Sequence, residues 1–310
     1  MSERTAQREV RQGRRTLRLS NLDKVFWPAE GITKGDLLDF YEALAPVVVP
    51  HLRGRPFTMK RFPNGIDGKH FFQKDAPSHM PDWIRTAVFQ TVSRRSGKPR
   101  TIRYPLVSDQ LSLSWMVSMG CIDLNVPLSR IDRPQRPDVV LFDLDPSPDA
   151  DFVECVRVAH LVRGALALLG LESCVKTSGS DGIHVIAPIA RRHTFADTHL
   201  LASTVAGALA RSHPGLVTTE FLKRKRRGVL IDVNQNGPGR TVASVYSVRP
   251  KPGAPVSTPL RWEELTENVR PQDYTMGVVL DRVGREGDLL SAAPTNSQPL
   301  GPALRALKEG

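Results

Sequence analysis

The hydrophobic positions of the chain follow two different periods, which predicts a mixture of helices and strands. From Leu37 to Ala45, apolar residues recur every three or four positions, as on one face of a helix. Thr33 and Asp36 are typical of a capping box at its start, and Pro46 and Pro50 are expected to end it. Similar patterns predict further helices over 111–119, 151–170 and 194–211.

Short apolar runs between turn residues predict the strands. They cover residues 58–62, 84–92, 101–107, 138–146, 174–177, 183–188 and 229–233. Because helices and strands do not alternate strictly, we expect an α+β fold with a mixed, largely antiparallel central sheet flanked by helices. About the last 60 residues hold many prolines, so we expect a loop-rich wrap there with one short helix near 262–265.

The length of the chain bounds its domain organisation. A chain of 310 residues fits one large domain or two interlocked halves. We find no linker long enough to separate independent domains. We therefore expect a basic, flexible arm at 1–16, one domain over 17–295, and a C-terminal tail at 296–310.

The apolar residues and the cysteines favour a cytoplasmic location. No apolar run approaches the length of a membrane span, and the first residues lack the apolar core of a secretory signal. Cys121, Cys155 and Cys174 suit neither a disulfide framework nor a zinc site, and they fit a reducing compartment. We expect no membrane partner.

The charge balance favours polyanionic partners. Lys and Arg number 43 and Asp and Glu 32, which gives a net charge of +11 at pH 7. Such a field attracts nucleic acid, nucleotides or an anionic membrane surface. The basic residues gather in two expected loops, which we predict to contact the phosphate backbone of DNA. The first loop contains Arg94, Arg95, Lys98, Arg100 and Arg103, and the second contains Lys223, Arg224, Lys225, Arg226 and Arg227.

Three acids are candidates for metal binding. Asp143 and Asp145 lie two residues apart at the end of an apolar strand, so their side chains point to the same face of a sheet. Carboxylates on one face repel each other unless a cation lies between them. Asp232 offers a third carboxylate from another strand. Oxygen ligands suit Mg²⁺ or Mn²⁺, and three such acids could hold two metals for phosphoryl or nucleotidyl transfer.

A turn rich in glycine and serine joins the expected strands 174–177 and 183–188. Gly179 allows backbone N–H groups to turn toward phosphate oxygens, and Ser178 adds a hydroxyl donor. His184 could donate to a phosphate or a sugar hydroxyl, or it could be a core histidine. The turn alone is weak evidence for a phosphate site, and its combination with the acids and the basic loops makes the prediction specific.

Seven short motifs also occur in order between about residues 17 and 265. They are Asn21-Leu-Asp-Lys-Val-Phe-Trp-Pro28, Lys60-Arg-Phe-Pro-Asn-Gly65, Phe71-Phe-Gln-Lys74, Phe142-Asp-Leu-Asp-Pro146, Ser178-Gly-Ser-Asp-Gly-Ile-His184, Ile231-Asp-Val-Asn-Gln-Asn236 and Tyr246-Ser-Val-Arg-Pro250. Together they resemble the polymerase domain of bacterial ATP-dependent DNA ligase D, a member of the archaeo-eukaryotic primase (primase-polymerase) superfamily. No Lys-x-Asp-Gly ligase signature is present, so we expect a stand-alone form.

The resemblance implies a primase-polymerase fold and a nucleotidyltransferase that adds nucleotides, preferably ribonucleotides, to DNA 3′ ends. It implies work in DNA repair, by end joining or gap filling, at short gaps or breaks that bear a 5′-phosphate. The expected cofactor is Mn²⁺, two per site, with Mg²⁺ as the alternative. Expected partners are DNA, nucleoside triphosphates, a Ku-type end-binding protein and a DNA ligase, in the nucleoid region of a bacterial cytoplasm.

The resemblance also assigns roles to individual residues. The metal-binding catalytic acids are Asp143, Asp145 and Asp232. The residues for the incoming nucleotide are Lys60, Phe72, Ser178, Gly179, His184 and Arg249, with Phe71 beside Phe72. The residues for the downstream 5′-phosphate are Asn21, Lys24, Lys34 and Arg61. The DNA-contacting loops include Arg94, Arg95, Lys98, Lys223, Lys225 and Arg226.

Two positions depart from the family pattern. The family often has His followed by Pro-Trp near the nucleotide sugar, where this chain has Asn125, Val126 and Pro127. The departure puts the expected ribose selectivity in question. Asp181 stands where the family commonly has Lys. An acid there should weaken triphosphate binding unless a neighbouring Lys or Arg compensates.

Two other functions fit part of the pattern. A phosphatase of the haloacid dehalogenase type also has Asp-x-Asp after an apolar strand, and it would use Asp143 as nucleophile and Asp145 as acid and base. The Thr or Val usual in that family two residues after the second Asp is Ser147 here. A non-catalytic module that binds DNA ends would need none of the acids.

Overall fold

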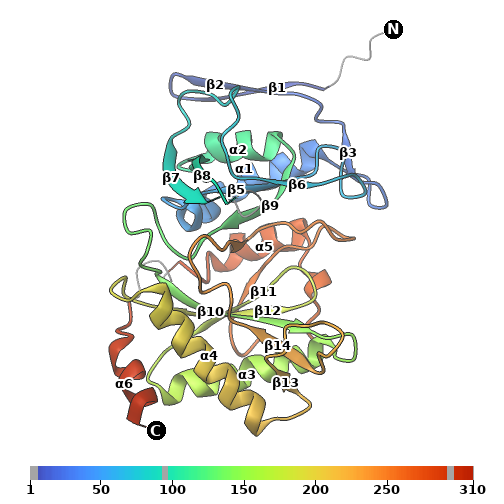
Figure 1. Ribbon diagram of the computed structural model, residues 1–310. Coiled ribbons are helices and arrows are strands. Elements are labelled where there is room, and N and C mark those ends of the chain that lie inside the picture. Colours follow the sequence, from blue (N-terminus) through green and yellow to red (C-terminus); the bar gives the residue numbers. More distant parts are fainter. Residues whose placement is uncertain (1–5, 93–96, 292–296, 310) are drawn as a thin grey trace.

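Two β-sheets lie one above the other in the molecule, each with helices packed on it (Figure 1). The computed structural model describes residues 6–92, 97–291 and 297–309. Nearly all neighbouring strands are antiparallel, so the predicted α+β class with a mixed, largely antiparallel sheet is confirmed. None of the helices within the described ranges is long and apolar enough to cross a membrane.

The smaller sheet has four antiparallel strands in the order β15-β9-β5-β6. The strands are β5 (Thr58–Arg61), β6 (Phe71–Gln73), β9 (Cys121–Val126) and β15 (Val242–Ala243). It shares one hydrophobic core with α1 (Lys34–Leu52) and α2 (Gln110–Ser118). This sheet carries Lys60 and Phe72 of the predicted site.

Helix α1 begins as predicted but ends later. The Thr33 side chain accepts a hydrogen bond from the Asp36 N–H, and the Asp36 carboxylate accepts one from the Thr33 N–H, as in a capping box. The helix then continues through Pro46 and Pro50 to Leu52, so the predicted end was wrong. Each proline removes one N–H donor, but the apolar face of the helix stays buried in the core and its burial outweighs that loss.

The larger sheet has six strands in the order β13-β14-β10-β12-β11-β16. The strands are β10 (Val139–Pro146), β11 (Cys174–Thr177), β12 (Ile183–Pro188), β13 (Val217–Thr218), β14 (Val229–Asp232) and β16 (Pro259–Leu260). Only the pair β13–β14 is parallel. The sheet shares a second core with α3 (Phe152–Leu168) and α4 (Phe195–Ser212).

Side chains alternate between the two faces of the larger sheet and thereby place the acids. Along β10, Phe142 and Leu144 are fully buried in the core shared with α3 and α4. Successive strand residues point to opposite faces, so Asp143 and Asp145 face away from these helices. That face looks toward the smaller sheet, because the ammonium group of Lys176 in β11 reaches the carbonyl oxygen of Ala243 in β15.

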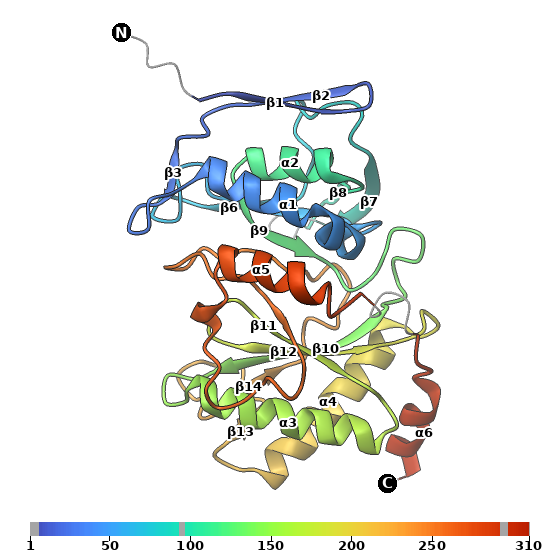
Figure 2. The same cartoon turned by 180° about the vertical axis from the view of Figure 1, so that it is seen from behind.

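The segment 242–260 belongs to both sheets. Its first strand, β15, pairs with β9 of the smaller sheet, and its last strand, β16, pairs with β11 of the larger sheet. Arg249 lies between these two strands in the sequence and therefore at the junction of the sheets. Helix α5 (Met276–Glu286) follows and crosses the same junction on the side seen in Figure 2.

Three expectations for the ends of the chain were wrong. Residues 8–16 belong to a hairpin of β1 (Arg8–Gln12) and β2 (Arg15–Leu19), not to a flexible arm, because Leu17 and Leu19 are buried. The expected tail contains α6 (Gly301–Glu309), which packs on α4. The helix expected near 262–265 is a turn, and α5 was not predicted.

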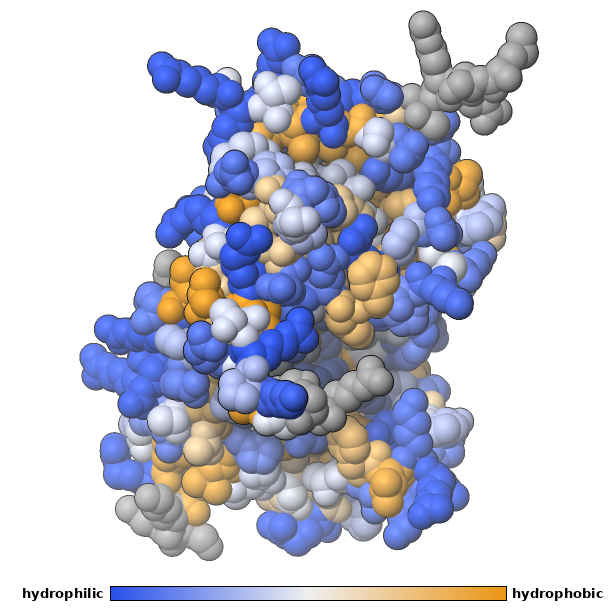
Figure 3. Space-filling model, turned by 45° about the horizontal axis from the view of Figure 1, so that its top comes forward, coloured by the Kyte–Doolittle hydropathy of each residue, from blue (hydrophilic) through white to orange (hydrophobic). Residues whose placement is uncertain are grey.

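Short hairpins complete the fold. They are β3 (Val25–Trp27) with β4 (Ile32–Thr33), and β7 (Thr86–Val92) with β8 (Pro99–Pro105), and a 3₁₀ turn η1 (Pro271–Asp273) precedes α5. On the face shown in Figure 3, hydrophilic residues cover most of the surface and apolar residues form small, separate patches.

Candidate active site

The three predicted acids come together on one face of the larger sheet. Asp143 in β10 and Asp232 in β14 are direct partners in the antiparallel register. Asp145 lies two residues further along β10 and points to the same face. The Asp232 side chain is buried, and the Asp143 side chain is 15% exposed. The structure therefore places the three predicted acids on one sheet face, and their role as metal ligands stays a prediction.

Asp145 has a raised pKa among the three carboxylates. Burial, followed by the negative charges of Asp143 and Asp232, raises the pKa of Asp145 to about 7. Burial also acts to raise the pKa of Asp143, but the neighbouring His184, Lys176 and Arg249 outweigh it, so that pKa is lowered. A site that holds so much like charge is typical of one built around a cation.

The donor set fits a hard divalent cation, although the side chains are not all turned toward one point. The Asp143 carboxylate lies 3.1 Å from His184 Nε2, and Asp232 accepts a hydrogen bond from the Asn234 N–H at 2.8 Å. Within the described ranges, no three His, Cys, Asp or Glu side chains are gathered closely enough for a ready-made metal site. Carboxylate oxygens are nevertheless the ligands that Mg²⁺ and Mn²⁺ prefer. Burial and the charges of Asp143 and Asp232 act on Asp145, which leaves it as a strong candidate ligand.

A row of charged residues continues across the sheet from the acids. In register, Asp232 is followed by Asp143, then by His184 in β12 and by Lys176 in β11. Lys176 is 2% exposed and donates to Ser257 Oγ and the Ala243 carbonyl. Burial, and then the charge of Arg249, lowers the pKa of Lys176 to about 7. Lys176 was not predicted to have a role, since one lysine before a turn carries no signal of its own.

The glycine-rich turn between β11 and β12 is tightly built. Ser178 Oγ accepts hydrogen bonds from the N–H groups of Ser180 and Gly182, both at 3.1 Å. Gly179 has a φ of +70°, and a Cβ atom there would lie 2.7 Å from Arg249 Cγ and from the Ser257 nitrogen. Only glycine fits both the backbone angle and this space. The turn is therefore pressed against the segment that carries Arg249.

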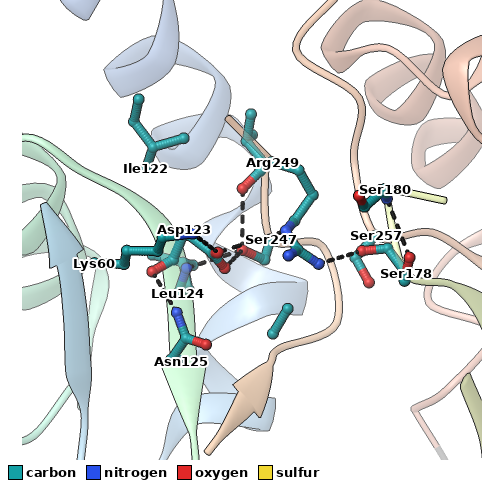
Figure 4. A network of polar contacts seen from close by, with 12 residues as sticks. Lys60, Ile122, Asp123, Leu124, Asn125, Ser178, Ser180, Ser247, Arg249 and Ser257 are labelled. Carbon is teal, nitrogen blue, oxygen red and sulfur yellow. Dashed lines mark hydrogen bonds and ion pairs between the residues drawn. The ribbon is translucent and has the colours of Figure 1, made fainter. Parts of the chain in front are cut away.

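A buried carboxylate, Asp123, holds two of the predicted nucleotide-binding cations (Figure 4). Its Oδ2 atom lies 3.6 Å from Lys60 Nζ and 3.5 Å from Arg249 Nε. Arg249 also donates to the Ser178 carbonyl at 2.6 Å, which joins the smaller sheet to the glycine-rich turn. Asp123 was not predicted from the sequence, where its signal is an acid in the middle of the largely apolar run Cys121–Val126.

The two predicted aromatic residues are exposed rather than part of the core. Phe71 is 45% exposed and Phe72 is 58% exposed. Lys60 lies directly opposite Phe72 in the β5–β6 register, and its ammonium group is 5.7 Å from the Phe72 ring centre. An exposed ring beside a cation offers a face on which a base can stack.

The four residues predicted to bind a downstream 5′-phosphate line one pocket of about 150 Å³. Asn21 has a positive φ of 57°, Lys24 donates to Asn64, and Lys34 donates to the Ser20 carbonyl. Arg61 donates to the Met119 carbonyl and to Gln73. Burial, and then the charge of Lys24, lowers the pKa of Lys34. No acid is found among the described residues that line this pocket, so it suits an anion.

The basic loops are described in part. Arg94 and Arg95 lie outside the described residues, and Lys98, Lys223 and Lys225 are exposed. Arg226, also predicted to contact DNA, has a buried side chain that donates to the carbonyls of Glu220 and Phe221, so its contact with DNA stays a prediction. Arg226 thus fixes the loop that carries Lys223 and Lys225. Its charge acts against the rise of the Asp145 pKa, which burial, Asp143 and Asp232 outweigh.

The two departures from the family pattern have local explanations. Asn125 is buried in β9 and donates to the Asp123 carbonyl at 3.0 Å. Asp181 forms an ion pair of 3.0 Å with Lys251. This pair supplies the compensating cation that an acid at this position requires.

The chain is similar in sequence to known proteins. Residues 33–290 match the family described as LigD, primase-polymerase domain. The multifunctional non-homologous end joining protein LigD of Mycolicibacterium smegmatis is 35% identical over 278 residues, which cover 89% of this chain and 36% of that protein. The DNA repair protein of the same name from Mycobacterium tuberculosis H37Rv is 36% identical over 88% of this chain and 36% of its own length. The chain spans about a third of these relatives.

A solved structure is similar as well. It is described as the polymerase domain from Mycobacterium tuberculosis ligase D in complex with DNA. The two chains superpose with a TM-score of 0.83 at 34% identity, over 90% of this chain and 98% of the other. The match in sequence and in fold shows that the chain belongs to the LigD primase-polymerase domain family, which consists of nucleotidyltransferases of the polymerase type.

Proposed function

We propose that the chain adds nucleotides to DNA 3′ ends at short gaps or breaks whose downstream end bears a 5′-phosphate. The observation that supports this most is the position of the acids. Asp143, Asp145 and Asp232 share one sheet face, beside the glycine-rich turn and the cations held by Asp123. Nucleotidyl transfer needs a site for developing negative charge next to a site for a triphosphate.

Asp143, Asp145 and Asp232 would hold the divalent cations, with Mn²⁺ preferred and Mg²⁺ as the alternative. Bound there, the cations supply positive charge to the primer hydroxyl and to the triphosphate. His184 would support Asp143 as a ligand. Its Nε2 atom lies 3.1 Å from the Asp143 carboxylate, and this contact would keep that carboxylate ionised and oriented.

The nucleotide would be positioned by residues of both sheets. Lys60 and Arg249 would place positive charge beside the triphosphate, in an orientation that Asp123 fixes. The hydroxyl of Ser178 would donate to a phosphate oxygen, since its contacts within the turn are hydrogen bonds that it accepts. Phe72 would stack on the base, an interaction worth about 1–3 kcal/mol in single-strand binding sites.

The pocket of Asn21, Lys24, Lys34 and Arg61 would select the DNA substrate. A terminal 5′-phosphate carries more negative charge than an internal phosphodiester, so three cations around it favour a gap over a simple primer end. The exposed Lys98, Lys223 and Lys225 would contact the DNA backbone. The names of the relatives support a role in non-homologous end joining. A Ku-type protein and a DNA ligase would be the partners in that role.

The test is extension of a duplex that contains a one-nucleotide gap. The duplex is offered with and without the 5′-phosphate, with ribo- or deoxyribonucleoside triphosphates, in Mn²⁺ or Mg²⁺. We expect addition that is faster with the 5′-phosphate, with ribonucleotides and in Mn²⁺. No addition under any of these conditions would contradict the proposed activity, and equal rates with and without the phosphate would contradict the role of the pocket.

A further inference from the structure

A short turn that begins at Arg249 carries part of the proposed nucleotide site. The Arg249 guanidinium donates to the Ser178 carbonyl at 2.6 Å and thereby reaches the glycine-rich turn (Figure 4). A few residues later, the N–H of Ala254 donates to the Lys251 carbonyl at 3.1 Å and closes the turn. We call residues 249–254 the Arg249 turn.

One end of the Arg249 turn is held in an unfavourable backbone conformation. Ala254 has a φ of +47°, in the left-handed region that a residue with a Cβ atom rarely adopts. A residue stays in such a conformation only where the surrounding structure fixes it. The Ala254 side chain is fully buried in the core of the smaller sheet. Packing therefore fixes this end of the turn, and the position of the rest depends on its hydrogen bonds.

The β3–β4 hairpin supplies two of these hydrogen bonds. The indole N–H of Trp27, at the end of β3, donates to the Lys251 carbonyl at 2.9 Å. That carbonyl therefore accepts from Trp27 and from Ala254 at once. Glu30, in the turn between β3 and β4, accepts a hydrogen bond from the Gly253 N–H. The hairpin thus holds the Arg249 turn at two points.

The two contacts differ in their surroundings. Trp27 is fully buried, so its N–H has no water to replace the Lys251 carbonyl. A buried N–H without an acceptor costs free energy, and Trp27 therefore favours the conformation in which that carbonyl faces it. Glu30 is exposed, so its side chain can be replaced without opening the core. The two residues offer independent ways to loosen the same turn.

The same hairpin also lines the predicted 5′-phosphate pocket. Lys24 and Phe26 belong to the lining of that pocket, and Phe26 directly precedes Trp27 in β3. Because successive side chains of a strand point to opposite faces, Phe26 faces the pocket while Trp27 faces the Arg249 turn. The hairpin therefore contacts both the pocket and the turn.

We propose that Trp27 and Glu30 are positioning residues for the incoming nucleotide. They hold the Lys251 carbonyl and the Gly253 N–H, and thereby fix the place from which Arg249 extends its guanidinium. Neither residue is itself a ligand of the nucleotide. The proposal rests on the proposed function for the role of Arg249. It gives the hairpin a second role, which does not require a DNA end in the pocket.

The test measures nucleotide binding without DNA. Fluorescence anisotropy of a fluorescent ATP analogue in Mn²⁺ gives its affinity for the wild type, Glu30→Ala, Glu30→Gln and Trp27→Phe. The Gln side chain keeps an oxygen that can accept from the Gly253 N–H, whereas Ala has none. Phe keeps an aromatic ring but has no N–H donor. The absence of DNA removes any effect of the 5′-phosphate pocket.

We expect Glu30→Ala and Trp27→Phe to weaken nucleotide binding about three- to tenfold, as the loss of one hydrogen bond does. Glu30→Gln should bind within about twofold of the wild type, because the hydrogen bond is kept. Removal of a negative charge alone would instead strengthen the binding of a triphosphate, and it would act alike in both Glu30 variants. Equal effects of Glu30→Ala and Glu30→Gln would therefore overturn the proposal.

The charge-matched control is Asp67→Ala, which removes another exposed acid beside the same hairpin. Its neighbour Ile66 donates its N–H to the Phe26 carbonyl at 2.9 Å, so the control disturbs the hairpin from its other side. This variant should bind the nucleotide within about twofold of the wild type. A loss as large as that of Glu30→Ala would mean that the effect is not specific to the Arg249 turn.

Hydrogen exchange of peptides that cover residues 249–254 reports the contact itself. Exchange should be faster in Glu30→Ala than in the wild type and unchanged in Glu30→Gln. Faster exchange with unchanged nucleotide affinity would overturn the positioning role. In extension of a gap without a 5′-phosphate, Glu30→Ala should raise KM for the nucleotide and leave kcat within about twofold. Failure of the wild type to add nucleotides would refute the proposed function, and the exchange result would still show whether the hairpin fixes the turn.

Discussion

Asp143 and Asp232 are register partners on the neighbouring antiparallel strands β10 and β14. Partners of this kind have Cα atoms about 4.5–5.5 Å apart and point to the same face. Two carboxylates at such a position, with Asp145 beside them, cost free energy in the metal-free chain. This electrostatic cost leads to the first prediction.

Replacement of Asp145 by Asn should stabilise the metal-free chain. The pKa of Asp145 is raised to about 7 by burial and by the charges of Asp143 and Asp232, so its ionised form is unfavourable at pH 8. We expect the free energy of unfolding to rise by about 1–3 kcal/mol at pH 8. Thermal unfolding in a chelator measures this change. Added Mn²⁺ should stabilise the wild type and leave Asp145→Asn unchanged.

The stability gained by Asp145→Asn should depend on pH. The pKa of Asp145 is higher in the folded chain than in the unfolded chain. Its proton therefore contributes to the free energy of unfolding below about pH 4, and this stabilisation is lost as the pH rises through about 7. The advantage of Asp145→Asn should therefore grow over this range. The variant Asp281→Asn, which removes an exposed acid of α5, serves as control. An advantage that is constant with pH would contradict the repulsion.

A second prediction concerns the pair Arg55 and Asp138, which lie just before β5 and β10. Asp138 Oδ2 accepts from Arg55 at 2.6 Å and from Arg130 at 3.1 Å, and its side chain is 8% exposed. Asp138→Asn should destabilise the chain by about 3–5 kcal/mol at pH 7, since it leaves buried cations without a partner. Urea unfolding measures the loss.

The stability loss should also depend on pH. Burial acts to raise the pKa of Asp138, but the charges of Arg55 and Arg130 outweigh it and lower that pKa. The stabilisation is therefore present above about pH 4 and lost as the pH falls through the folded value. The difference between the wild type and Asp138→Asn should shrink below about pH 4. If the stability difference between the wild type and Asp138→Asn persists below about pH 4, the charge of Asp138 is not its cause.

A third prediction separates nucleotide binding from DNA binding. Asp123 holds Lys60 and Arg249 at 3.6 and 3.5 Å. Asp123→Asn should raise KM for the nucleotide about three- to tenfold, because both cations lose their orientation, while DNA affinity changes less than about twofold. Steady-state kinetics at varied nucleotide concentration measure this KM. A lower KM would mean that Asp123 masks the two cations rather than orienting them.

A fourth prediction concerns the 5′-phosphate pocket. Lys24→Ala should weaken binding to a 5′-phosphorylated gap about tenfold and to an unphosphorylated gap about twofold, since one charge-assisted contact is lost. Anisotropy titrations measure both affinities. Lys223→Ala, in the second basic loop, is the control and should weaken both equally. Equal losses for Lys24→Ala on the two substrates would exclude a contact with the phosphate.

Much of the fold follows from local patterns in the sequence. The apolar run from Val139 to Phe142 predicts a buried strand, and Asp143 and Asp145 two residues apart at its end share the face opposite α3 and α4. The capping residues Thr33 and Thr194 mark the starts of α1 and α4. Family membership also excludes the haloacid dehalogenase alternative.

The remaining features depend on tertiary contacts. Pro46 and Pro50 do not end α1, because its apolar face is buried in the core. The basic residues of β1 and β2 suggest a flexible arm, but Leu17 and Leu19 anchor the hairpin. Asp123 becomes recognisable only once the fold brings Arg249 from a distant segment to its side.

The central claim is that Asp143, Asp145 and Asp232 act together in nucleotidyl transfer. The most direct measurement is single-turnover extension of a 5′-phosphorylated one-nucleotide gap by the wild type and the three Asp→Asn variants, with DNA affinity measured alongside. The account predicts that each variant loses about a thousandfold or more in rate and binds the gap within about twofold of the wild type. A variant at any of the three positions that extends the primer at the wild-type rate would contradict the account.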